Sequence, residues 1–351
     1  MAVYKKVPGH ETVNISTLEF DETPTPGSLN PVTSGGVAES VAQQSSNIAE
    51  AFSASSTYAI GEVVIGPDGK LYQCTTAVET SGEWDPDDWT ESSMGEQVAL
   101  MNAELVELEI SMMRSIPISK GMRFVFSKKD YNPVEAGIGS GTWKRVGKYA
   151  NIWDFNRAQA SWSGQFSSAF SDSENLVSVI AADVSHVTSF QNLFNACPSM
   201  TECCDLNSSS CTSFYQMFNR CTSLSIVGTI DTTSATNVND MFFTCSNLTK
   251  IPDITGNNVT SIHNFCSYCN KITRLPTISS TIITDCEAAF RACPKVETGA
   301  LDMYNQLSSQ STPPTVVSNC FKDCGISTTS GVAELAQIPA SWGGTGPEPT
   351  P

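Results

Sequence analysis

The side chains best suited to chemistry in this sequence are its 13 cysteines. Thiolates form disulfides and bind zinc, and Cys266 and Cys269 have the spacing of half a zinc site. His263 is the only imidazole close to them in the sequence, so a zinc site is kept as the minor alternative. The chain opens without the apolar segment of a secretory signal, and we therefore expect it to fold in a reducing cytosol. A complete disulfide framework is not expected there.

No other arrangement of side chains predicts catalysis. The histidines, His10, His186 and His263, are widely separated, and the sequence has no serine-nucleophile elbow, phosphate loop or zincin motif. The carboxylates of Asp85 and Asp87 stand in a predicted turn, where solvated groups are more common than a glycosidase dyad or a calcium site. We expect a protein that is not an enzyme and that uses no cofactor and no metal.

The cysteine spacing indicates a repeat in the second half of the chain. The cysteines that recur every 24 residues are Cys197, Cys221, Cys245, Cys269 and Cys293. Phenylalanine stands three residues before most of them, and an aliphatic residue or methionine stands three residues after. One such unit cannot enclose a core, but stacked units bury a continuous one. We therefore expect these cysteines to fill the core as small apolar side chains.

Each repeat unit has the pattern of a short strand followed by a short helix. Leu248–Ile254 predicts a strand and turn, and Val259–Cys266 has the three- and four-residue spacing of a helix or 3₁₀ turn. Residues 161–340 are accordingly predicted to form a leucine-rich-repeat solenoid. Met217–Leu224 and Met241–Ile254 closely resemble the repeat of BspA-like surface proteins. The resemblance implies an adhesive scaffold, and recognition rather than chemistry.

Contacts with a receptor are expected from exposed polar residues between the buried columns. An insertion at Tyr304–Thr315 interrupts the repeat and is a second candidate contact, since such loops often bind partners. The candidate contacts of the repeat are Asp231, Thr233, Asp253, Asn257, Asn258 and Tyr304.

Residues 55–93 are predicted to form a separate small β-unit. Strands at Tyr58–Val64 and Gly69–Cys74 and a closing segment at Trp84–Trp89 resemble the carbohydrate-binding modules of the chitin-binding type. Thr75-Thr76 stands where that family places an exposed aromatic pair for sugar stacking. The candidate glycan contacts of this unit, which are also candidate core residues, are Tyr72, Trp84 and Trp89.

Residues 37–54 and 94–116 carry apolar residues at alternating three- and four-residue spacing. Each is predicted to be a short coiled-coil neck, and a helix packed on its own domain has the same pattern. The string Thr25–Val37 resembles a lead-in found near the start of bacteriophage fibre proteins, before a trimeric neck. The resemblance implies a homotrimer in which residues 1–36, with a proline-rich linker, bind other virion proteins.

The fold class predicted from these segments is mixed and multidomain: an extended N-terminal anchor, short trimeric coiled-coil necks, a small β module and a C-terminal BspA-like leucine-rich-repeat solenoid. Residues 117–160 are predicted to be a small β connector that caps the solenoid, with Arg123–Phe126 pairing with Trp143–Val146. Residues 341–351 are predicted to be a flexible tail.

Charge excludes two classes of partner. The formal charge of −17 and the pI near 4.5 disfavour binding to nucleic acid or to anionic lipid, and no apolar run is long enough to enter a membrane. The leading prediction is a structural bacteriophage virion fibre, attached to the head or the tail and made in the host cytoplasm, whose tip binds a host-surface glycan or protein. The alternatives are a bacterial BspA-like surface adhesin and a tail-associated glycan hydrolase.

Overall fold

A computed structural model of the chain describes residues 4–5, 13–14, 49–137, 141–156 and 169–348. The chain divides into two compact units, Met1–Glu104 and Leu105–Pro351. In the first unit, β1 (Tyr4–Lys5) pairs with β2 (Val13–Asn14) in antiparallel fashion. The rest of the predicted anchor and most of the first predicted neck lie outside the described residues.

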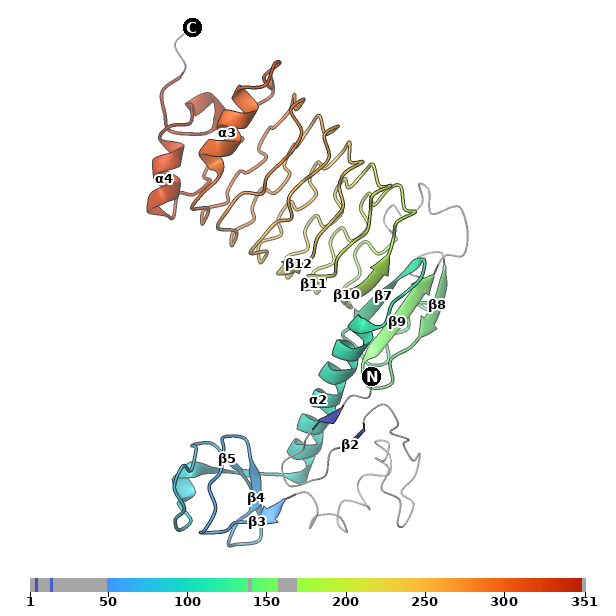
Figure 1. The fold of residues 1–351 in the computed structure, drawn as a ribbon, viewed down its shortest axis with the longest axis vertical. Helices are drawn as coiled ribbons and strands as arrows, with labels where there is room; N and C mark the ends of the chain where they lie inside the picture. Colours follow the sequence, from blue (N-terminus) through green and yellow to red (C-terminus); the bar gives the residue numbers. More distant parts are fainter. Residues whose placement is uncertain (1–3, 6–12, 15–48, 138–140, 157–168, 349–351) are drawn as a thin grey trace. The chain divides into compact units, whose positions relative to one another are not determined.

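The small β-unit of the first part is a four-stranded mixed sheet in the order β3-β4-β5-β6 (Figure 1). Its strands are β3 (Glu50–Ala51), β4 (Val63–Ile65), β5 (Leu71–Cys74) and β6 (Trp89–Ser92), and a 3₁₀ turn, η3 (Pro86–Asp88), leads into β6. Val64, Cys74 and Trp89 are buried at its centre, with five partly buried aliphatic and aromatic side chains around them. A unit this small has a core made mainly of aromatic rings because each ring buries a large area.

Helix α2 (Met94–Ser115) covers the second predicted neck. Ser93 begins it with a capping box, in which the Ser93 hydroxyl accepts from the Glu96 amide and the Glu96 carboxylate accepts from the Ser93 amide. Its last turns pack Val106, Ile110 and Met113 against a buried aliphatic cluster of the second unit. The coiled-coil prediction is wrong: this part of the helix is held by its own domain.

The second unit contains a six-stranded mixed sheet in the order β12-β11-β10-β7-β9-β8. Its strands are β7 (Gly121–Phe126), β8 (Thr142–Arg145), β9 (Asn151–Asn156), β10 (Leu176–Asp183), β11 (Glu202–Cys203) and β12 (Ile226–Val227). β7, β8 and β9 pair in antiparallel fashion, and β10, β11 and β12 pair in parallel. The predicted pairing of β7 with β8 is wrong, because β9 lies between them.

Two buried charged side chains fix α2 to this sheet. The Glu109 carboxylate accepts from the backbone amides of Lys148, Tyr149 and Ala150 at 2.7–2.9 Å. The Arg123 guanidinium pairs with Asp154 and also donates to two carbonyls at the end of α2. Each buried charge thus has full hydrogen bonding, which such groups require.

The repeat region, defined here as residues 169–298, is a row of 24-residue units lying side by side (Figure 1). Parallel bridges join successive units, for example Ser189 to Ser213 and Ser213 to Asn237. Phenylalanine rings stack along the core, with centroids 5.5–5.8 Å apart from Phe170 to Phe242. The predicted burial of the cysteine column is confirmed, since its five members are 0% exposed and none forms a disulfide.

The fold-class prediction of a leucine-rich-repeat solenoid is wrong. The described residues are mostly sheet and loops, with two larger mixed sheets, neither of them closed. Where a short helix or 3₁₀ turn was expected in each unit, the chain makes tight turns instead. In the unit of Phe190–Ala196, every second amide donates to a carbonyl of the next unit, and a helix would have used these amides internally.

The end of the second unit is covered by helices. The α-helices are α3 (Ala300–Ser308) and α4 (Thr329–Leu335), and a 3₁₀ turn, η4 (Ala340–Trp342), follows them. Leu335, Ile338 and Trp342 join the buried core of the repeat region. Residues 341–348 were predicted to be part of a flexible tail, but they include buried Trp342, and Ser341 bonds to Glu348.

Candidate recognition surface

The exterior of the repeat region carries polar side chains in register from unit to unit. Threonine hydroxyls donate to the carbonyl one unit earlier, as from Thr212 to Thr188, from Thr236 to Thr212 and from Thr284 to Thr260, at 3.1–3.2 Å. These bonds stabilise the row at its surface and fix the direction of each side chain. The surface therefore presents polar groups at a regular spacing, which is close to the 4.7–4.9 Å separation of neighbouring strands.

The sequence-predicted contacts on this surface differ in how they are held. The Asp231 carboxylate accepts from the amide and hydroxyl of Thr233, and the Asp253 carboxylate accepts from the amide of Thr277. Asn257 and Asn258 are exposed in the turn that follows Asp253. The Asp231 carboxylate therefore shapes a local turn, and the Asp253 carboxylate joins two successive units. Both also have oxygens with capacity for a further donor.

The predicted contact Tyr304 lies on α3 rather than in a loop. Its ring packs edge-on against Trp342, with centroids 5.2 Å apart, and is partly buried against the core. The predicted insertion thus begins inside a helix, and this tyrosine has a packing role.

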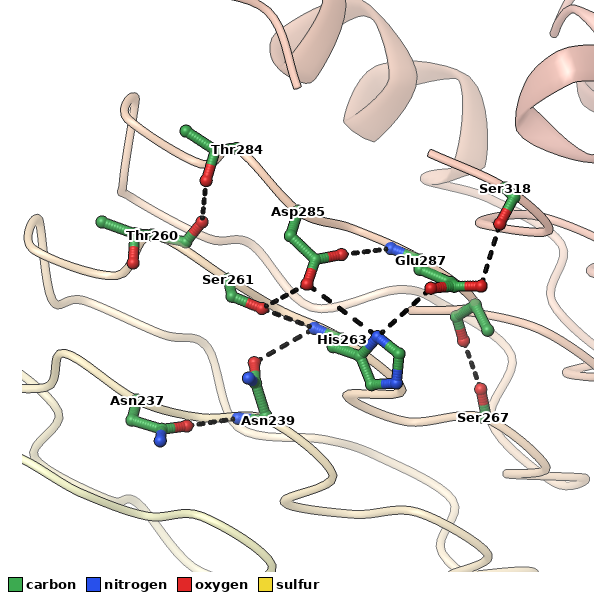
Figure 2. A network of polar contacts seen from close by, with 11 residues as sticks. Asn237, Asn239, Thr260, Ser261, His263, Ser267, Thr284, Asp285, Glu287 and Ser318 are labelled. Carbon is green, nitrogen blue, oxygen red and sulfur yellow. Dashed lines mark hydrogen bonds and ion pairs between the residues drawn. The ribbon is translucent and has the colours of Figure 1, made fainter. Parts of the chain in front are cut away.

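A polar network that sequence reasoning missed surrounds His263 (Figure 2). The ring Nδ1 lies 3.9 Å from a carboxylate oxygen of Asp285 and 3.8 Å from one of Glu287. Ser261 donates to Asp285, and Ser318 donates to Glu287. The network joins three successive units, and its residues occupy two positions of the repeat that are two residues apart. These shared repeat positions are the sequence signal that could have predicted the network.

The network has the groups for hydrogen bonding but is not a metal site. In the described parts of the chain, no group of three or more histidine, cysteine or acidic side chains is placed to hold a metal ion. The backbone amide of His263 is also occupied, since it donates to Asn239 and Ser261. Its geometry suits polar contact with a ligand more than catalysis.

The column thiols are hydrogen-bond donors inside the core. Each donates to a carbonyl 27 residues earlier, at 2.9–3.2 Å, from Cys197 to Phe170 through Cys293 to Cys266. Burial raises the pKa of Cys245 well above its ordinary value. A protonated and buried thiol is a poor nucleophile and a poor metal ligand, so these cysteines stabilise the stack.

A hollow of about 570 Å³ lies between the end of α2 and the first repeat units. Arg114, Asp183, Cys204 and Asp205 are among its lining residues. Arg114 forms a bidentate ion pair with Glu202, which raises the pKa of the arginine. Burial raises the pKa of the Cys204 thiol to about 12. The thiol therefore remains protonated near neutral pH and supplies no nucleophile.

The predicted glycan contacts of the small β-unit pack mainly on one another. Trp89 is 6% exposed, and its ring stacks on that of Trp84 with centroids 4.9 Å apart. Tyr72 meets Trp84 edge-on at 5.0 Å, and its hydroxyl donates to Asp68. Thr75 caps the neighbouring turn by donating to the Asp88 carbonyl. Trp84 and Tyr72 are half-buried, so they keep a limited surface for a ligand.

Residues 164–278 match the family described as Mycoplasma protein of unknown function, DUF285. A DUF285 domain of the Mycoplasma type is present. It fits BspA-like surface repeat proteins loosely, and it covers most of the repeat region. Neither the curated proteins nor the solved structures gave a match. No helix of the described residues is long and apolar enough to cross a membrane.

Proposed function

We propose that this chain is a surface-recognition protein whose repeat region binds a glycan or protein on a cell surface. The observation that carries the proposal is the separation of the core from the surface. Buried columns and backbone bonds between units hold the stack together, while the exterior presents polar groups in register. A surface of this kind can contact an extended polar partner at several points.

Within this proposal the setting is a bacteriophage virion fibre. Residues 1–36 would bind other virion proteins, and the repeat region would contact the host. The support is the string Thr25–Val37, which resembles the lead-in of phage fibres. The homotrimer remains a prediction, but a coiled-coil neck at residues 94–116 no longer supports it. A bacterial surface adhesin is the second candidate, and the DUF285 match favours it, since that domain fits surface repeat proteins loosely.

The test is attachment of the labelled full chain to a panel of bacterial cells. Fab fragments raised against residues 169–348 should block attachment, and Fab fragments against residues 49–92 should not. No attachment to any cell type, or a block by the second Fab only, would refute the proposal. The two settings are separated by immunogold labelling with the first Fab, which should decorate phage particles if the chain is a fibre and bacterial envelopes if it is an adhesin.

A further inference from the structure

The positive charges of the repeat region are concentrated beside the cysteine column. From two residues before to five residues after each column cysteine from Cys221 on, and likewise around Cys324, which follows the repeat region, the sequence has seven lysines and arginines and two acidic residues. The same window at Cys197 has no basic residue and one acidic residue. The whole chain has 19 basic and 36 acidic residues. These windows therefore reverse the charge balance of the protein. We call this surface the basic strip.

Two aromatic rings lie within the basic strip. Tyr268 is 36% exposed, and its ring meets half-buried Phe243 edge-on with centroids 5.7 Å apart. The guanidinium of Arg291 lies 5.7 Å from the centre of the Tyr268 ring. An exposed ring beside a cation is suited to stacking on a sugar face while the cation meets an anionic group.

Backbone hydrogen bonds hold these residues in successive units. The Arg220 amide donates to the Phe243 carbonyl, and the Tyr268 amide donates to the Arg291 carbonyl, both at 2.8 Å. The Ala292 amide continues the row to the Lys322 carbonyl. With about 4.8 Å between units, the four steps from Arg220 to Lys322 span roughly 19 Å. The strip thus has the length of a short oligosaccharide rather than of a single small anion.

The cations of the strip are available for a partner. Among the residues that the structure describes, no acidic side chain lies within 4.0 Å of the charged groups of Arg220, Arg291 or Lys322. The nearest acids in the sequence are Asp323, beside Lys322, and Glu287, four residues before Arg291. Unpaired cations on an otherwise acidic protein form a local site for anionic groups, and the neighbouring Tyr268 ring favours anionic groups that a sugar chain carries.

We propose that the basic strip binds an acidic polysaccharide, a chain of sugar rings that bears carboxylate or phosphate groups. The inference rests on the proposed function and names its ligand class. Tyr268 and Phe243 contact the apolar face of a sugar, and Arg220, Arg291 and Lys322 pair with the acidic groups of neighbouring sugars. A guanidinium can hold a carboxylate through two parallel bonds, which gives preference over neutral glycans.

The test measures binding of the full chain to polygalacturonate, with neutral dextran and a single-stranded DNA oligonucleotide as comparisons. We expect binding to polygalacturonate alone, weakened by raising the salt from about 50 to about 300 mM. R220E/R291E should weaken it about tenfold, since each exposed pair is worth up to about 1 kcal/mol. Tyr268→Ala should also weaken it, and Tyr268→Phe should not. The matched control is K128E/K144E, which makes the same charge change on exposed lysines outside the strip.

Equal weakening by K128E/K144E, or DNA binding as tight as polygalacturonate binding, would overturn the inference. Wild-type attachment to cells with no preference for polygalacturonate over dextran would overturn it too, while leaving the proposed function in place. Failure of the proposed function is separate, since it shows as no attachment to cells. Circular dichroism of each variant checks that the fold is intact, which is expected because Arg220 is exposed and Arg291 is half-buried.

Discussion

Replacing Cys245 tests whether the column thiols act as donors or only as apolar filling. The Cys245 side chain is 0% exposed, and its Sγ donates to the Phe218 carbonyl at 3.1 Å. Cys245→Ala removes this bond, worth about 1 kcal/mol, and the burial of one sulfur, worth about 1 kcal/mol. The carbonyl keeps the Cys221 amide as a donor, so no acceptor is stranded. We expect a loss of about 2 kcal/mol in the free energy of unfolding.

Two further variants at this position separate the explanations. Cys245→Leu loses the same bond and also overpacks the column, and it should cost about 1–3 kcal/mol more than alanine. Cys245→Ser keeps a hydrogen-bond donor, but its hydroxyl is more polar than the thiol and fills the apolar core less well. If the thiol bond matters, serine should be at least as stable as alanine.

The assay is urea unfolding under reducing conditions, followed by far-ultraviolet circular dichroism. Cys204→Ala is the matched control because this thiol is half-buried. This variant should lose less than about 1 kcal/mol of the free energy of unfolding. Serine less stable than alanine would refute the donor role. Rapid reaction of Cys245 with a thiol reagent in the folded protein would refute its burial.

Four more outcomes are expected. Burial raises the pKa of Cys211 to about 12 from 9.0. The unfolded chain therefore loses this proton first, and Cys211 should contribute about 1.4 kcal/mol per pH unit to the fall in stability between pH 9 and pH 12, so Cys211→Ala should reduce the total slope that urea midpoints measure by about this amount. Glu109→Gln should cost about 2 kcal/mol and speed hydrogen exchange at the amides of 148–150, because an amide group turns a donor toward them; unchanged exchange would contradict the role of Glu109 in fixing α2 to the sheet. Trp342→Ala should cost about 3 kcal/mol and expose the C-terminal end to protease, and equal protease resistance would argue against a closing role. Thr244→Gly should stabilise by about 0.5 kcal/mol in the same urea assay, since this β-branched residue has φ +61°; a loss would mean that its side chain contributes packing.

The buried columns were predictable from the sequence because they are periodic. The spacing of 24 residues identified Cys221 and Phe218 as core positions, and both are 0% exposed. The same phase would have found the His263 network and the basic strip, whose members recur near fixed distances from the column cysteine. The sequence did not predict them because only the apolar positions were compared between units. Surface chemistry in a repeat protein is best sought by comparing equivalent positions.

The helix or 3₁₀ turn expected at Val259–Cys266 could not be distinguished from the observed tight turns by apolar spacing alone. Both structures place every third or fourth side chain inward. The deciding factor is which carbonyls accept from the backbone amides, and in this structure many of these carbonyls belong to the neighbouring unit. The contacts by which Glu109 and Arg123 fix α2 to the sheet could not be predicted either, because the partners lie 7–41 residues away and follow no period. Non-local contacts of this kind leave no local sequence pattern.

The turns that replace the helices also explain how the surface can carry recognition. Each unit has two left-handed residues four positions apart, such as Asn264 at φ +50° and Tyr268 at φ +64°. The first position holds asparagine or aspartate in four of six units, residues that tolerate this conformation. The second position holds alanine, arginine, threonine or tyrosine in five of six, so residue preference does not produce the conformation there. The amide bonds to the next unit must impose it, at about 1–2 kcal/mol for each residue. Because the backbone at the second position does not depend on the side chain, this position can hold the chemistry that a ligand requires, and in this chain it holds Arg220 and Tyr268 of the basic strip.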